Sequence, residues 1–305
     1  MDLIALRIAL YAALFAQFGI AAFGIYALKP SERGGRIPFR YARVLPPLAF
    51  LALVFGVLGI VAHLASMAGT GWWPVNREML GAMLGGTDLG VAWVVRLAAP
   101  ILALAGSMVF RRSATPLLAV HLVSSSVAIA TLVWSGHAGA TEDYRGTIHR
   151  SGDTLHMLAA AVWFGGLLSF TALLSSRDIA TDPARIALAT RTLDQFSRVG
   201  MIAVAVIVVT GLFNSAMTFG LGNLARLDRA YAALLAFKLL LFAAMLGCAA
   251  FNRWHLTPAL KSGDAADVTL SALRRTIMLE TLAGVLLFAA VAWLGTLDPI
   301  ANVSI

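Results

Sequence analysis

Charged side chains are scarce in this sequence. Asp, Glu, Lys and Arg make up 12% of its 305 residues, and 60% of the residues are apolar, whereas soluble domains carry roughly 25% charge. A soluble protein of this length would need a much more polar exterior to cover its core. The composition therefore argues against a soluble globular protein and favours one that is surrounded by lipid.

Cysteine and nucleotide-binding motifs are also lacking. Cys248 is the single cysteine of the sequence, so no intramolecular disulfide can form. The sequence contains no Walker motif and no Gly-rich phosphate loop, which argues against ATP-driven transport by this chain alone. It also has no segment that reads as a soluble catalytic domain, and we expect no enzymatic activity.

Long apolar segments are what the sequence has in abundance. A helix needs about 20 residues to cross a hydrocarbon layer of ~30 Å. The segments of this sequence reach that length, and their apolar and polar residues do not alternate as they would in the strands of a membrane barrel. The predicted spans are residues 3–28, 46–67, 89–110, 116–135, 153–175, 197–219, 231–251 and 276–296. We therefore predict an all-α bundle of about eight transmembrane helices, with residues 1–305 forming a single transmembrane domain. Small residues such as Gly165 and Gly166 suit close helix contacts in lipid.

The basic residues between the spans predict the orientation of the chain. The loops after the first, third, fifth and seventh spans hold 15 Lys and Arg residues, and the loops on the other side hold 5. Because basic loops stay in the cytoplasm, both termini are predicted to be periplasmic. The net charge of +8 is then mainly a signal of topology. Its distribution over separate short loops argues against a nucleic-acid-binding surface.

Histidines gather near the predicted periplasmic ends of the spans. Four of the six occur there, namely His63, His137, His149 and His156. Imidazole and thioether groups are copper ligands, and thioethers favour Cu(I). His63 and Met67 are four residues apart, which places them on one face of a helix. The alternative for Met67 is a methionine that fills a gap in the core.

The densest group of polar residues lies between residues 149 and 156. Asp153 follows His149 by four residues and precedes His156 by three, so its carboxylate can orient either imidazole. We place His149 in the loop and His156 in the fifth span. If both were helical they would be about 10 Å apart along the axis, which favours successive copper stations or a site completed by His137 or His63. Alternatively, Asp153 and His156 form a buried polar clamp and His149 is an ordinary loop residue.

Three cations and three further candidate ligands lie within the spans. Arg7, Arg96 and Lys238 either extend to the outer interface, or one of them pairs with Asp153. Towards the cytoplasm, a second station could be formed by His121, Cys248 and Glu280. The alternatives are a small buried apolar role for Cys248 and an ion pair of Glu280 with Arg274 or Arg275.

Several motifs between residues 120 and 296 are more specific than the general pattern. They are Ser135-Gly-His137-Ala, the run from Asp153-Thr-Leu-His156 to Trp163-Phe-Gly165-Gly166-Leu, Phe196-Ser197, Thr210-Gly211, Lys238, Asn252-Arg253 with Pro258, and Glu280 in the last span. Together they resemble the copper resistance protein D (CopD) family. The resemblance implies a multi-pass protein of the bacterial inner membrane that moves copper from the periplasm towards the cytoplasm. It also implies a separate periplasmic copper carrier of the CopC type as partner.

These observations lead to one main functional hypothesis and two alternatives. The main hypothesis is copper transport or uptake, with Cu(I) or Cu(II) accepted at a periplasmic site drawn from His63, Met67, His137, His149 and His156, and with Asp153 orienting the ligands. One alternative is a haem-binding electron-transfer protein or metalloreductase, because His63 and His156 lie at similar depth on different helices. The other is a copper-binding assembly or scaffold protein.

Overall fold

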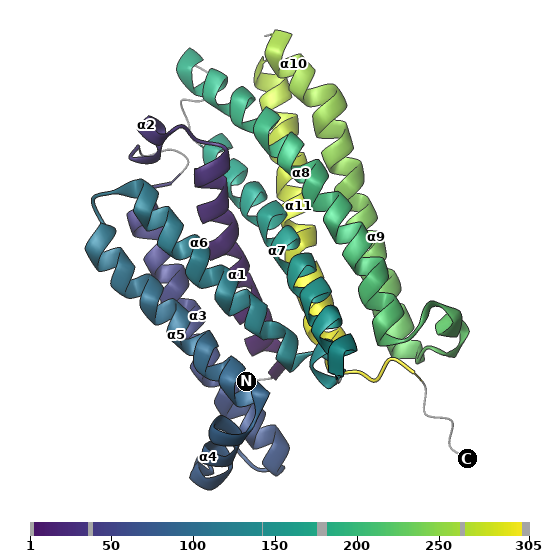
Figure 1. Ribbon diagram of the computed structural model, residues 1–305. Coiled ribbons are helices and arrows are strands. Elements are labelled where there is room, and N and C mark those ends of the chain that lie inside the picture. Colours follow the sequence, from purple (N-terminus) through teal and green to yellow (C-terminus); the bar gives the residue numbers. More distant parts are fainter. Residues whose placement is uncertain (1–2, 36–38, 142, 176–181, 263–265, 301–305) are drawn as a thin grey trace.

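The computed structural model describes residues 3–35, 39–141, 143–175, 182–262 and 266–300, and all its long elements are helices (Figure 1). Eight helices are long and apolar enough to span a membrane, which confirms the predicted number. They are α1 (Leu3–Tyr26), α3 (Tyr41–Ala68), α5 (Asp88–Phe110), α6 (Ala114–Ala130) with its continuation η1 (Thr131–Ser135), α7 (Asp143–Leu174), α8 (Pro183–Thr218), α9 (Arg229–Phe251) and α11 (Ala266–Leu294). Helix α1 begins and α11 ends at the same end of the bundle, which we call the terminal end.

Shorter helices lie at the two ends of the bundle. At the terminal end these are α4 (Arg77–Gly86), η2 (His137–Ala140) and η3 (Leu221–Arg226). At the opposite end, α2 (Pro30–Arg33) follows α1, and α9 continues through the π-turn η4 (Asn252–Leu256) into α10 (Thr257–Ser262).

Three of the spanning helices are longer than their apolar segments. Helix α7 begins ten residues before the predicted span, at Asp143, and α8 and α11 likewise begin at Pro183 and Ala266. The apolar pattern marks only the part of a helix that lies in hydrocarbon. The helix itself extends beyond this part, to the residue that caps its N-terminus. In α8 the cap is Asp182, whose carboxylate accepts a hydrogen bond from the Ala184 amide (2.9 Å). The placement of His149 in a loop was therefore wrong, because it lies within α7.

Helix α1 forms the centre of the bundle. It packs against α3, α6, α7 and α11, and 67% of its most apolar stretch is buried, compared with 6% for α9. At its crossing with α7 the two backbones touch. A Cβ added to Gly19 would lie 2.0 Å from the Ala161 carbonyl oxygen, and one added to Gly165 would lie 2.1 Å from the carbonyl carbon of Gly19. The expected role of small residues in close helix contact is thus confirmed.

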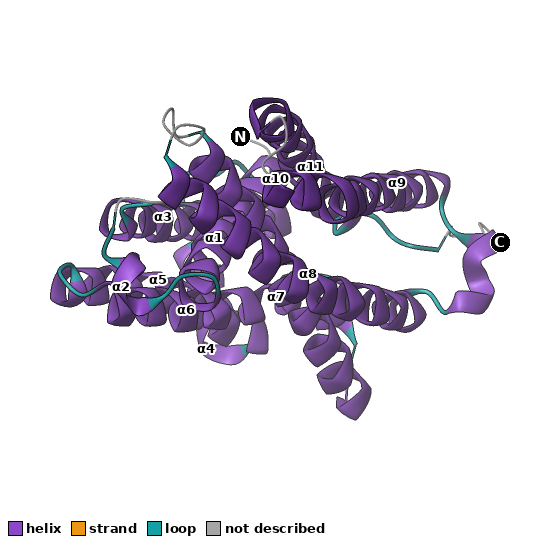
Figure 2. Ribbon diagram, turned by 90° about the horizontal axis from the view of Figure 1, so that it is seen from above, coloured by secondary structure: helices purple, strands orange, loops and turns teal. Residues whose placement is uncertain are grey.

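The other helices divide into two groups around α1. Helices α3, α5 and α6 pack on one side, and α7, α8, α9 and α11 lie on the other (Figure 2). Although α8 and α9 are consecutive spans, α8 packs mainly on α7 and α9 mainly on α11. Most of the surface of α9 is therefore available to lipid.

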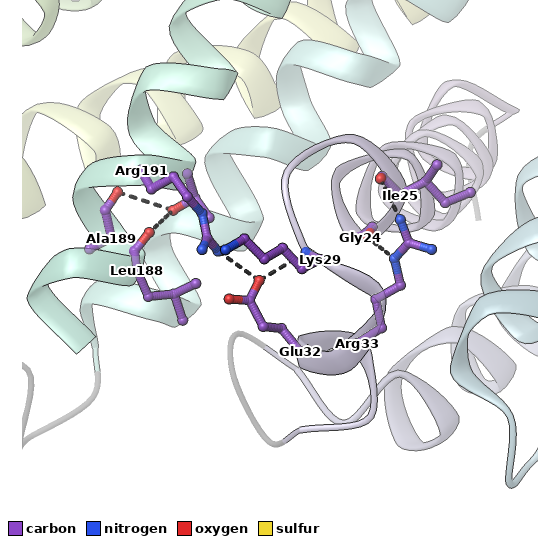
Figure 3. Close-up of polar contacts among 9 residues, drawn as sticks. Gly24, Ile25, Lys29, Glu32, Arg33, Leu188, Ala189 and Arg191 are labelled. Carbon is purple, nitrogen blue, oxygen red and sulfur yellow. Dashed lines mark hydrogen bonds and ion pairs between the residues drawn. The ribbon is translucent and has the colours of Figure 1, made fainter. Parts of the chain in front are cut away.

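A polar contact connects the two groups at the end opposite the termini (Figure 3). The Glu32 carboxylate of α2 accepts hydrogen bonds from the Arg191 guanidinium of α8 (2.6 Å) and from the Lys29 amide (2.8 Å). Desolvation raises the pKa of Glu32, but these two donors outweigh it and hold the pKa below the ordinary value. Arg33 donates to the Gly24 and Ile25 carbonyls and so fixes α2 to the end of α1.

Candidate functional site

Five polar side chains meet in the terminal half of the bundle, on three helices. They form what we call the α7–α8–α9 cluster: Asp153 and His156 on α7, Thr210 and Asn214 on α8, and Lys238 on α9. Asp153 and His156 are three residues apart, so they share the helix face that is turned towards α8 and α9. Polar and ionisable groups within a membrane span are costly, which makes this cluster a candidate for function.

The imidazole of His156 is held by α8. Its Nδ1 lies 3.0 Å from Thr210 Oγ1. The Thr210 hydroxyl has one proton, which it donates to the Val206 carbonyl at 2.5 Å, so it accepts the hydrogen bond from Nδ1–H. This network assigns the proton to Nδ1 and the lone pair to Nε2. Neutral imidazole in this tautomer can bind a metal through Nε2.

Asp153 is turned towards Asn214 and Lys238. The Asn214 amide donates to Asp153 Oδ1 (3.1 Å), and the carboxylate interacts electrostatically with the half-buried Lys238. Lys238 thus lies within electrostatic range of Asp153, and an ion pair between the two stays a prediction. The described contacts of His156 do not include Asp153, so the two residues are linked through α8 and α9 rather than directly.

The other predicted histidines of this region lie nearer the terminal end. His149 is buried in α7, and its Nδ1 is 3.0 Å from Thr141 Oγ1. It lies two helical turns before His156, a separation of about 10 Å along the axis. His137 opens η2 in the segment between α6 and α7, and its side chain is outside the described part of the structure.

His63 is in a different environment from His156. It lies on α3 and lines a small cavity together with Arg7 and Arg96, whose charges act on its imidazole. Two guanidinium groups at such a site repel a copper cation. Met67, one helical turn further on, is 58% exposed, so it does not fill a gap in the core.

Arg96 does not extend to the interface, contrary to one of the two expectations. Its side chain is 3% exposed. It donates to Thr131 Oγ1 (3.0 Å), to the Thr131 carbonyl (2.5 Å) and to Ser135 Oγ (3.0 Å). Neighbouring helices offer these acceptors within the bundle, and periodicity along one helix does not reveal them.

A second buried group surrounds Glu280 in the opposite half of the bundle. Glu280 accepts hydrogen bonds from the Asn252 amide (2.7 Å) and from the Trp163 indole, and Thr276 donates to Asn252 Oδ1 (2.5 Å). Cys248, on the preceding turn of α9, interacts electrostatically with the Glu280 carboxyl. Among the described ion pairs there is none between Glu280 and Arg274 or Arg275, so that expectation is not met. Sequence reasoning missed the roles of Asn252, Thr276 and Trp163, although the first and last lie in the motifs that carry the family resemblance.

His121 belongs to neither group. It is fully buried on α6, where its Nδ1 is 3.1 Å from Gln17 Nε2 and its Nε2 is 2.8 Å from Ser107 Oγ. Both ring nitrogens are engaged, so His121 joins α1, α5 and α6. It lies across α1 from Cys248 and Glu280 and does not extend their group.

The described residues contain no group of three or more His, Cys, Asp or Glu side chains close enough to hold a metal ion. The candidate copper ligands are instead spread along α7, from His149 to His156, and around Glu280.

Comparisons with known proteins show which family the chain belongs to. The family model described as "Copper resistance protein D-like, N-terminal domain" matches residues 1–147, and "Copper resistance protein D" matches residues 190–294. Copper resistance protein D of Pseudomonas syringae pv. tomato is 36% identical over 304 residues, which cover 97% of this chain and 96% of that protein. The chain belongs to the CopD family. The resemblance seen in the sequence is thereby confirmed.

Similarity to the CopD family extends over nearly the whole chain. Inner membrane protein YebZ of Escherichia coli (strain K12) is 25% identical over 296 residues, which are 97% of this chain and 98% of YebZ. The chain thus resembles a protein of the bacterial inner membrane, as its eight candidate spans require. No solved structure matches it. Within the CopD match lie Thr210, Asn214 and Lys238 of the α7–α8–α9 cluster, as well as Glu280 with its partner Asn252.

Proposed function

We propose that this chain transports copper across the bacterial inner membrane and accepts it at a terminal-end site that includes His156. Membership of the copper resistance family supports copper as the cargo. The observation that carries the proposal is the orientation of His156. Thr210 engages Nδ1, and with the proton on Nδ1 the Nε2 lone pair is the one that can bind a metal, as in an imidazole oriented by a neighbouring polar group.

Further candidate ligands lie between His156 and the terminal end of the bundle, along α7 and just before it. His149 lies two turns away on the same helix, and His137 lies in the segment that leads into it. With both termini in the periplasm, as the basic loops indicate, these residues form a periplasmic path towards His156. A separate carrier of the CopC type would deliver copper there. His63 and Met67 are less favourable ligands, because His63 adjoins two arginines and Met67 is exposed.

Beyond His156, the path continues towards the group around Glu280. Met245 is buried on α9 one turn before Cys248, and both sulfur atoms suit Cu(I). The Glu280 carboxyl can bind a metal or exchange a proton as copper passes. Transport of this kind needs side chains that bind and release the ion, and no step in it forms or breaks a covalent bond of a substrate.

Lys238 has a specific part in this proposal. Its ammonium balances the charge of Asp153 while the site holds no copper. A copper ion that reaches His156 competes with Lys238 for the negative field of Asp153. Weak binding follows from this competition, and weak binding is what a transport site requires in order to release its cargo.

The proposal is tested by measuring copper bound to the purified protein. His156→Ala should lower the copper affinity without preventing membrane insertion, whereas His255→Ala, at an exposed position in η4, should have no effect. If both variants bind copper as the unmodified protein does, His156 is not a ligand. A visible spectrum of the same sample tests the haem alternative, because a Soret band would replace copper transport with electron transfer.

A further inference from the structure

A small cavity lies between α1, α3, α5 and η1 and is lined by none of the five residues of the α7–α8–α9 cluster. Its volume is about 30 Å³, which is room for one or two particles of the size of a water molecule. The polar groups that line it are Arg7, Tyr11, His63, Trp93, Arg96 and Ser135. No Asp or Glu side chain is among the lining residues.

Two full positive charges adjoin this cavity, and all their described hydrogen-bond acceptors are neutral. Arg96 donates to Thr131 and Ser135, as described above. Arg7 donates to the Gly295 carbonyl (3.1 Å) and to the Ser135 carbonyl (3.3 Å). Within the described residues, neither guanidinium has a carboxylate within 4.0 Å. Buried charges in proteins are paired or coordinate an ion of opposite charge, because an uncompensated charge in a low dielectric is costly.

The indole of Trp93 also lines this cavity, and its N–H lacks an acceptor among the described residues. Trp93 is 4% exposed, and its indole Nε1 is buried without a hydrogen-bond partner in the described part of the chain. The guanidinium carbon of Arg96 lies 4.2 Å from the centre of the Trp93 ring. Buried N–H groups without a partner are rare in native proteins. An orphan donor, two excess positive charges and a cavity therefore occur at one place.

We propose that this cavity is a binding site for a small inorganic anion of the size of chloride. Such an anion accepts hydrogen bonds from the Trp93 indole and from the guanidinium groups, and its charge offsets theirs. The small volume favours a monatomic anion. By holding α1, α3, α5 and η1 together, the anion stabilises the group of helices that does not contain the α7–α8–α9 cluster.

The test uses the full-length protein in detergent, without chloride and with a chelator that removes copper. Chloride is then exchanged for gluconate at constant ionic strength, and the midpoint of thermal unfolding is followed. A ligand that binds only the folded state raises this midpoint with its concentration, so we expect a saturable rise with chloride. An equal midpoint in chloride and gluconate overturns the proposal. Since copper is absent, the result is independent of the transport proposal.

Variants locate the site. Trp93→Phe keeps an aromatic side chain, although a smaller one, and removes the N–H donor. It should weaken chloride binding by about tenfold, the effect of one hydrogen bond to a charged group. Arg96→Gln should abolish the chloride response if it folds. The matched control is Arg226→Gln, which changes an exposed arginine at the same end of the bundle and should leave the response intact. Chloride-35 NMR line broadening measures the affinity directly, and an unchanged affinity in Trp93→Phe contradicts the proposal.

Discussion

His156 and Thr210 hold each other in one orientation across the boundary between α7 and α8. Nδ1 of the imidazole is 3.0 Å from the Thr210 hydroxyl oxygen, and that hydroxyl is in turn bonded to the carbonyl of Val206. Thr210, which lies 54 positions after His156 in the chain, therefore sets the direction of the Nε2 lone pair of the imidazole. The predictions below follow from this contact, from other contacts of the bundle and from the charges of its loops.

The first prediction concerns the support of His156 by Thr210. Thr210→Val keeps the shape of the side chain but removes the acceptor for Nδ1–H, so the ring loses its fixed orientation. We expect the copper affinity to fall roughly 10- to 100-fold, as is typical when a group that orients a metal ligand is lost. The affinity is measured by competition with a chelator. Thr190→Val, on the same helix, is the control, because the Thr190 hydroxyl bonds only to the Ile186 carbonyl of its own helix. Equal losses in the two variants would contradict the assignment.

The second prediction concerns the charges of Asp153 and Lys238. Asp153→Asn leaves the half-buried Lys238 without the nearby negative charge of Asp153, and we expect lower thermal stability. Adding Lys238→Met should restore part of this loss, with a coupling of about 0.5–3 kcal/mol between the two positions. The free energies of unfolding of both single variants and the double variant give the coupling. Simple additivity would show that the two charges do not interact.

Asp153→Asn also has a predicted effect on copper. The affinity should fall, because the negative field that attracts the cation is lost. Since Asp153 and His156 make no direct contact in the described structure, the losses caused by Asp153→Asn and His156→Ala should be nearly additive in free energy. Chelator competition on the double variant measures this. A double variant no worse than His156→Ala would indicate that Asp153 acts through the imidazole.

The third prediction concerns the crossing of α1 and α7. Gly165→Ala places a methyl group against the backbone of Gly19, which cannot move aside as a side chain can. Overpacking of this kind costs about 1–3 kcal/mol of stability. Gly247→Ala is the control, since a Cβ at Gly247 on α9 meets no other atom within 4 Å. Thermal unfolding of the two variants in detergent should show a lower midpoint for Gly165→Ala alone.

The fourth prediction concerns the orientation in the membrane. Both termini should be periplasmic, because the loops on the opposite side hold 15 of the basic residues. Reporter fusions after α11 should be active only when the reporter works in the periplasm. Activity of a strictly cytoplasmic reporter at that position would reverse the direction of the proposed copper path.

Much of the fold could be predicted from the sequence, but the partners of the polar residues could not. The spans were predicted because burial in lipid requires long apolar segments. Spacing along one helix correctly placed Asp153 and His156 on one face. Their hydrogen-bond partners Asn214 and Thr210 lie on α8, and only the packing of the two helices brings them together. The interpretation of Arg96 failed for the same reason, since η1 of another span provides its acceptors.

The separate attachment of α8 and α9 has a consequence for how the site can move. His156 and Thr210 belong to the paired helices α7 and α8, whereas Lys238 belongs to the pair of α9 and α11. A sliding of one pair past the other changes the distance between Lys238 and Asp153 and leaves the hydrogen bond of His156 intact. If His156 binds copper as proposed, such a movement would change the electric field at the bound ion without displacing the imidazole.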